Sequence, residues 1–140
     1  MLKKFFKTDK KKDSNNNMLI IALLIHAAKI DENYSENERE IILKTTMELS
    51  KTNHDEAEKL LKLAEKKEAE SNQIVEYTKE IKKYSMDFRL KIIEIIWKIV
   101  YSDGTKDNYE SNLIRRICGL LYISDKDSGI IKMKVENLNK

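Results

Sequence analysis

Two stretches of the chain are apolar on nearly every side of a helix, whereas several others are apolar on one side only. Residues 18–25 and 92–100 contain the densest runs of aliphatic side chains. A helix that is apolar all round is normally buried in a globular protein. We therefore expect two central helices, over about 17–30 and 85–101, which the other helices surround.

Five further segments have apolar residues at helical spacing on one face, and most of them follow a residue that can cap a helix. They run from 35 to about 49, from 52 or 53 to about 70, from 74 to about 84, from 107 to about 121, and from 124 to about 138. The third helix also has a dense mix of Lys and Glu, which is typical of a solvated face. The pattern predicts an all-α, single-domain bundle of about seven helices. The absence of proline and the presence of only three glycines favour the same fold.

The chain contains an internal repeat with an offset of 72 residues. It aligns Asp31 with Asp103, Ser35 with Asp107, Glu38 with Glu110, and Ile42 with Ile114. In each copy an apolar helix ends at an aspartate, and a capped turn then leads into an amphipathic helix. This arrangement predicts two pseudo-repeated helix–acidic-turn–helix units.

The four carboxylates of these turns allow two interpretations. A carboxylate at a helix C-terminus faces the negative end of the helix dipole, at a cost of about 0.3–1 kcal/mol. In the structural interpretation, Asp31 and Asp103 accept hydrogen bonds from turn amides, while Glu38 and Glu110 complete capping boxes. In the functional interpretation, the four carboxylates bind a divalent cation through oxygen ligands. The alternating ligands and central glycine of an EF-hand are missing, so that motif is excluded.

The basic character of the chain belongs to its N-terminus. Residues 1–17 contain six lysines and two aspartates, and the rest of the chain is almost neutral. We expect residues 1–16 to form a disordered lysine-rich arm and residues 17–140 to form the helical domain. A nucleic-acid-binding face is not expected, although the arm could make a weak contact with an anionic membrane. The apolar run 18–25 resembles a signal segment, but it is shorter than the ~20 residues that span a bilayer.

Few residues suggest other chemistry. His26 and His54 lack the spacing of a zinc motif, and no glycine-rich phosphate loop is present. Cys118 and Trp97 lie on apolar faces, where a core thiol and a core aromatic residue are expected. A single cysteine cannot form an internal disulfide, which fits a cytoplasmic protein. We therefore expect no enzymatic activity and no cofactor other than the candidate cation.

The two acidic turns also resemble a known family, the TerB-like tellurite-resistance proteins. The resemblance rests on 99–104 with Glu110 and 120–124, and on 27–31 with Ser35 and Glu38. It covers about residues 18–138, and it departs from the family pattern where Glu32 and Asn33 replace the expected glycine. It implies two pseudo-symmetric helical layers, no established enzymatic activity and a link to tellurite or general stress resistance. It also implies an acidic surface, at Asp31, Glu38, Asp103 and Glu110, that binds metal ions or protein partners.

Two functions follow from these expectations. The first is a cytoplasmic stress-response adaptor that presents an acidic, cation-binding surface to a protein partner. The alternative is a peripheral membrane or scaffold module, in which the basic arm directs targeting and the helical body forms a homodimer. The sequence identifies neither the partner nor the metal.

Overall fold

A computed structural model of the chain describes residues 10–29, 34–71, 73–102 and 108–138. The helices of these residues are α1 (Lys10–Ala28), α2 (Glu36–Ser50), α3 (His54–Glu70), α4 (Ile74–Ile81), α5 (Met86–Tyr101), α6 (Asn108–Leu120) and α7 (Asp125–Leu138). No strand occurs in the described ranges. The predicted all-α bundle of seven helices is therefore confirmed. None of the described helices is both long enough and apolar enough to cross a bilayer.

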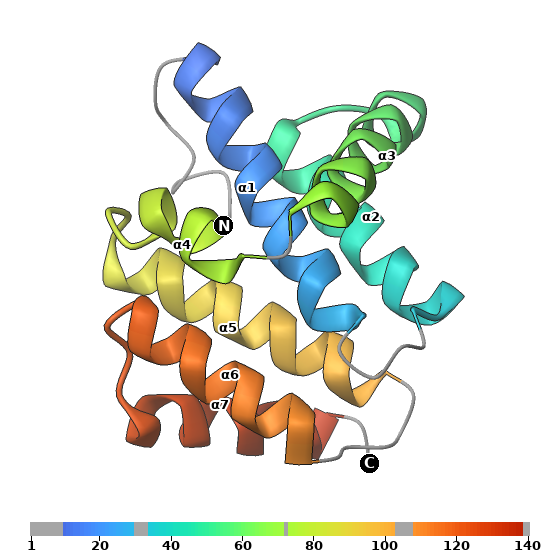
Figure 1. The fold of residues 1–140 in the computed structure, drawn as a ribbon. Coiled ribbons are helices and arrows are strands. Elements are labelled where there is room, and N and C mark those ends of the chain that lie inside the picture. The colour runs from blue at the N-terminus through green and yellow to red at the C-terminus, as the bar shows by residue number, and fades with distance from the viewer. Residues whose placement is uncertain (1–9, 30–33, 72, 103–107, 139–140) are drawn as a thin grey trace.

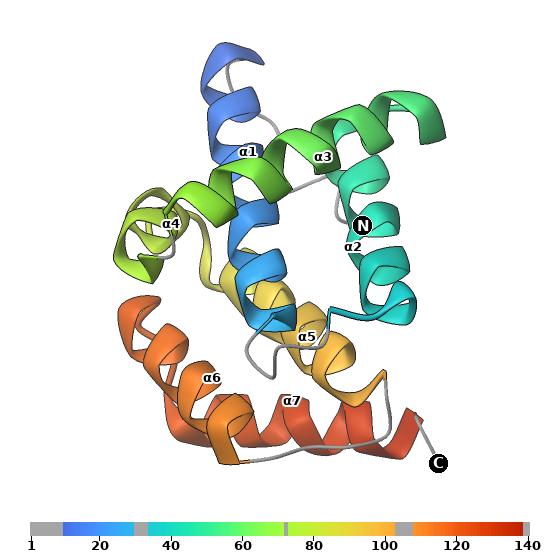
Figure 2. The same ribbon diagram turned by 45° about the vertical axis from the view of Figure 1, so that its right-hand side comes forward.

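Helices α1 and α5 form the centre of the bundle, as their apolar patterns predict. The side chains of residues 20–25 on α1 are all fully buried. They are buried because α1 packs against α2, α3, α4 and α5, which lie around it. Helices α6 and α7 lie on the other side of α5 from α2 and α3 (Figures 1 and 2). The core therefore runs continuously from α1 through α5.

Helix α1 begins earlier than its sequence predicts. It starts at Lys10 rather than near residue 17, so the prediction of a disordered arm is wrong for residues 10–16. Asn16 and Asn17 are buried, and the Asn16 amide donates a 3.2 Å hydrogen bond to the hydroxyl of Tyr84. This long-range bond gives a polar side chain a partner inside the helix, where a loop was expected. Residues 1–9 of the predicted arm lie outside the described residues.

The repeat extends over three helices in each copy, which is one helix more than the sequence predicts. Helices α2 and α6 begin 72 residues apart, and α3 and α7 begin 71 residues apart. Seven buried side chains of α1 each have a buried counterpart on α5, 72 positions later. The pairs are Ile20 and Ile92, Ile21 and Ile93, Leu23 and Ile95, Leu24 and Ile96, Ile25 and Trp97, Ala27 and Ile99, and Ala28 and Val100. We call α1–α3 the first unit and α5–α7 the second unit; α4 has no counterpart.

The turn after the second helix of each unit repeats in detail. Lys51 and Tyr122 have φ angles of 53° and 60°, in the left-handed region that usually favours glycine. The next residue in each turn donates a backbone hydrogen bond five residues back, from Thr52 to Met47 at 3.2 Å and from Ile123 to Cys118 at 2.9 Å. This is the hydrogen bond of a Schellman C-cap. The two units therefore reverse direction in the same way.

Candidate functional site

Glu38 has the structural role that the first interpretation assigns to it. Ser35 caps α2, and its backbone N–H donates a 2.8 Å hydrogen bond to Glu38 Oε1. In return, the Glu38 N–H donates to Ser35 Oγ at 3.1 Å. The capping box predicted from the sequence is therefore confirmed here. Because Glu38 is only 2% exposed, its carboxylate belongs to the packed end of the helix.

The other three predicted site residues cannot be compared with Glu38. Asp31 and Asp103 lie outside the described residues, and Glu110 belongs to α6 but its side chain is not described. Within the described part of the chain, no three side chains of His, Cys, Asp or Glu are grouped as metal ligands would be. The four-carboxylate cation site therefore stays a prediction.

Glu65 on α3 connects this helix to the start of α2. Its Oε2 accepts a 2.7 Å hydrogen bond from the Tyr34 hydroxyl and a 3.0 Å hydrogen bond from Arg39 Nε. Arg39 also pairs with Glu58, one helical stretch earlier on α3. Burial, followed by the bond to Glu65, raises the pKa of the Tyr34 hydroxyl. The bond from Arg39 lowers the pKa of Glu58, so this carboxylate is ionised at neutral pH.

Glu68, also on α3, connects to the end of α1. Its side chain is only 6% exposed, and its two oxygens contact different partners. Lys29 Nζ donates to Oε1 at 2.9 Å, and His26 Nδ1 lies 3.1 Å from Oε2. A buried carboxylate is costly unless it is paired, and these two contacts provide the pairing. Together, Glu65 and Glu68 fix α3 to both helices that flank the first acidic turn.

The sequence analysis placed these α3 carboxylates on a solvated face, and for Glu68 that prediction is wrong. The spacing contains the signal that was missed. The buried residues Ala57, Leu61 and Ala64 form the apolar stripe of α3, and position 68 continues this stripe by four residues. A glutamate in line with buried residues must itself be buried. Its partners come from α1, and the local sequence does not identify them.

The remaining candidate residues behave largely as predicted. His54 is exposed in the first turn of α3, and Cys118 and Trp97 are buried. Burial raises the pKa of the Cys118 thiol, which keeps it protonated and unreactive at neutral pH. His26 lies at the edge of the core, where it contacts Glu68.

These features define a class of protein, an all-helical domain built from two related three-helix units with charged side chains fixed around the first inter-helix turn. Residues 17–133 match the family model described as tellurite resistance protein TerB. The chain therefore belongs to the TerB family, as the resemblance of its acidic turns predicts. No curated protein and no solved structure matches it.

Proposed function

We propose that this TerB-family chain is a non-enzymatic adaptor in a cytoplasmic response to tellurite or related stress. Its contact surface for a protein partner is an acidic face formed by Glu36 and Glu40 on α2 and by Glu58 and Glu65 on α3. Two charged helices held in a fixed geometry suit this role, because a preorganised surface loses little conformational entropy on binding. The complementary partner is a basic protein segment.

The hydrogen-bond network around Arg39 carries this proposal. Arg39 bonds both Glu58 and Glu65, so it holds α2 and α3 together at one point. Glu36 and Glu40 lie on either side of Arg39 along α2, and both are exposed. Neither has an ion pair among the described residues, so their charges are available to a partner. Glu58 and Glu65 are half-buried and add to the negative potential of the same face.

Affinity purification from the native cell tests the proposal with charge-matched variants. The test variant is Glu36→Gln with Glu40→Gln, and the control is Glu48→Gln with Glu70→Gln. Both variants remove two exposed carboxylates from α2 or α3, so they change the net charge equally. The proposal requires a partner that the wild type and the control retain and the test variant loses. Equal recovery by both variants would refute the acidic face as the contact surface.

Divalent-cation binding is a narrower hypothesis for the repeated acidic turns. It is supported by the aspartate and glutamate at equivalent positions in both copies, Asp31 with Glu38 and Asp103 with Glu110. Glu38 is the weakest of these ligands, because one of its oxygens already accepts a hydrogen bond from the Ser35 backbone. We therefore propose the turn of the second unit, with Asp103 and Glu110, as the stronger cation site. Gly104 allows this turn to fold closely around a ligand.

A further inference from the structure

The two three-helix units differ most where their second and third helices meet. In the first unit this interface is apolar: Leu43, Ala57 and Leu61 are all buried. The repeat offsets of 72 for the second helix and 71 for the third place Arg115, Ser128 and Lys132 at the equivalent positions. Arg115 is exposed and Lys132 is half-buried, and only Ser128 is still enclosed. The second unit has thus replaced a closed apolar contact with polar and charged side chains.

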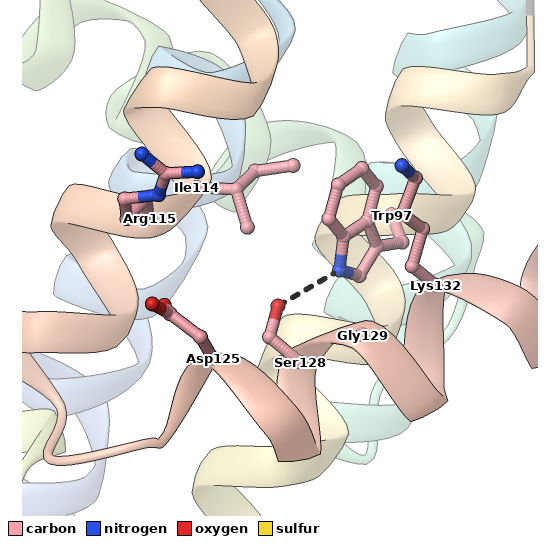
Figure 3. A pocket seen from close by; sticks show the side chains of 7 residues that line it. All are labelled: Trp97, Ile114, Arg115, Asp125, Ser128, Gly129 and Lys132. Atoms are coloured by element: carbon pink, nitrogen blue, oxygen red, sulfur yellow. Dashed lines mark hydrogen bonds between the residues drawn. The ribbon is translucent and has the colours of Figure 1, made fainter.

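This replacement opens a pocket between α5, α6 and α7. The pocket has a volume of about 190 Å³ and is lined by Trp97, Ile114, Arg115, Asp125, Ser128, Gly129 and Lys132 (Figure 3). Helix α6 contacts α7 along less of its length than α2 contacts α3, which is consistent with this opening. Since water occupies about 30 Å³ per molecule in the liquid, the pocket has room for a group of roughly six water molecules.

The pocket has an apolar wall and a charged rim. The wall is formed by Ile114 and by the indole of Trp97, which is held in place by a 3.3 Å hydrogen bond from its Nε1 to Ser128 Oγ. The Lys132 ammonium lies 5.6 Å from the centre of the indole ring. Arg115, on α6, lies on the opposite side of the lining from Lys132, with Trp97 and Ser128 between them (Figure 3).

The rim carries two cations and one anion. Neither Arg115 nor Asp125 has an ion pair within the described part of the chain, whereas Lys132 lies 4.0 Å from Glu136. A net charge of +1 favours a monoanion, and the Asp125 carboxylate disfavours a doubly charged group such as a phosphate dianion. The planar fork of a guanidinium matches a carboxylate with two parallel hydrogen bonds. The indole wall in turn suits a flat or compact apolar body.

We propose that the α5–α6–α7 pocket binds a monocarboxylate attached to a compact aromatic or apolar group. Arg115 binds the carboxylate, Lys132 adds a second positive charge, and Trp97 with Ile114 contacts the apolar group. Two sources share this chemistry, a free organic acid and the C-terminal residue of a polypeptide. The site lies in the second unit, and it does not depend on the acidic face of α2 and α3.

Trp97 makes the pocket directly measurable, because it is the only tryptophan of the chain. The intact protein is titrated with benzoate, and the tryptophan fluorescence is recorded. Benzamide, which has nearly the same shape without the charge, is the matched control ligand. The tripeptide Gly-Gly-Phe with a free carboxylate is compared with benzoate: tighter binding of the tripeptide identifies a polypeptide terminus, and tighter binding of benzoate identifies a free acid.

Three variants localise the response. Arg115→Met and Lys132→Met each remove one cation and retain an unbranched apolar side chain. Gly129→Leu retains both cations but places a side chain in the pocket, where an added Cβ would meet no atom within 4 Å. Circular dichroism verifies that each variant is folded, which is expected because Arg115 is exposed and Gly129 has open space beside it.

The expected result is a saturable fluorescence change with a carboxylate and little change with benzamide. Arg115→Met should weaken carboxylate binding at least about tenfold, since hydrogen bonds between charged groups are the strong ones. Gly129→Leu should abolish the change. The proposal is overturned if neither carboxylate alters the fluorescence, if benzamide is as effective as benzoate, or if folded Arg115→Met and Gly129→Leu bind like the wild type.

Discussion

Replacing Glu68 by glutamine tests whether a buried ion pair holds α3 against α1. The side chain is 6% exposed, so its charge has left bulk water almost completely. Removing one partner of a fully buried ion pair costs about 3–5 kcal/mol, which sets the upper limit. Lys29 is 42% exposed and regains hydration when its partner is lost, and glutamine keeps one oxygen that can accept its hydrogen bond. We therefore expect a loss of about 2 kcal/mol, the range of a hydrogen bond to a charged group.

Urea denaturation followed by circular dichroism measures this loss as a change in the free energy of unfolding. Glu70→Gln is the matched control, because Glu70 is exposed near the end of the same helix. A substitution at such a site normally changes stability by no more than about 0.5 kcal/mol. If both variants lose equally little stability, the Lys and Glu face of α3 is uniformly solvated and the argument from burial is wrong.

A double-mutant cycle with Lys29→Met separates the ion pair from other effects of the substitution. The 2.9 Å contact between Lys29 Nζ and Glu68 Oε1 predicts a coupling free energy of about 1 kcal/mol. Strictly additive losses would show that the contact contributes nothing to stability. In that case the burial of Glu68 would be supported by His26 alone.

Three further predictions concern the turns, the core of the second unit and the acidic turns. Lys51→Gly should stabilise the protein by about 0.5–1 kcal/mol in thermal or chemical denaturation, because glycine adopts the 53° φ angle without strain; a loss of stability would contradict this. For Glu94, burial raises the pKa, but hydrogen bonds and charges from three lysines outweigh it and lower the pKa overall. The stability that Glu94 contributes is therefore present above its unfolded pKa of about 4.3 and is lost as the pH falls through its lower folded pKa, so Glu94→Gln should lose less stability on acidification than the wild type. If the acidic turns bind a divalent cation, millimolar calcium, magnesium, manganese or zinc should raise the melting temperature of the wild type by mass action, and Asp103→Asn or Glu110→Gln should abolish the rise. Flat calorimetric titrations with all four ions would exclude the cation hypothesis.

The helices could be predicted from local patterns, because their caps and apolar faces are local. Ser35 and Ser85 accept the hydrogen bonds of N-caps, as their positions before amphipathic segments indicate. The start of α1 could not be predicted in this way. Asn16 is stabilised inside the helix by Tyr84, which lies 68 residues away in sequence. A polar residue that obtains its partner from a distant segment looks like a helix breaker when only its neighbours are considered.

The charged sites show the same division between local and distant information. The burial of Glu68 follows from its spacing to Leu61 and Ala64, and a stricter use of helical periodicity would have found it. Its pairing with His26 and Lys29 depends on how α3 packs on α1, which the local pattern does not contain. The exchange of Leu43 for Arg115 is visible in the sequence only after the repeat is aligned. The offset changes from 72 to 71 between the second and third helices, and this shift hides the substitutions at Ser128 and Lys132.

Helix α1 makes the two repeated units depend on each other for folding. It contacts α2 and α3 of its own unit, α4, and both α5 and α6 of the second unit. If the chain were cut between α3 and α4, one fragment would expose most of the apolar circumference of α1, and the other would lose the partner of α5. Despite its duplicated architecture, the protein should therefore unfold in one cooperative transition, unlike an array of independent repeats.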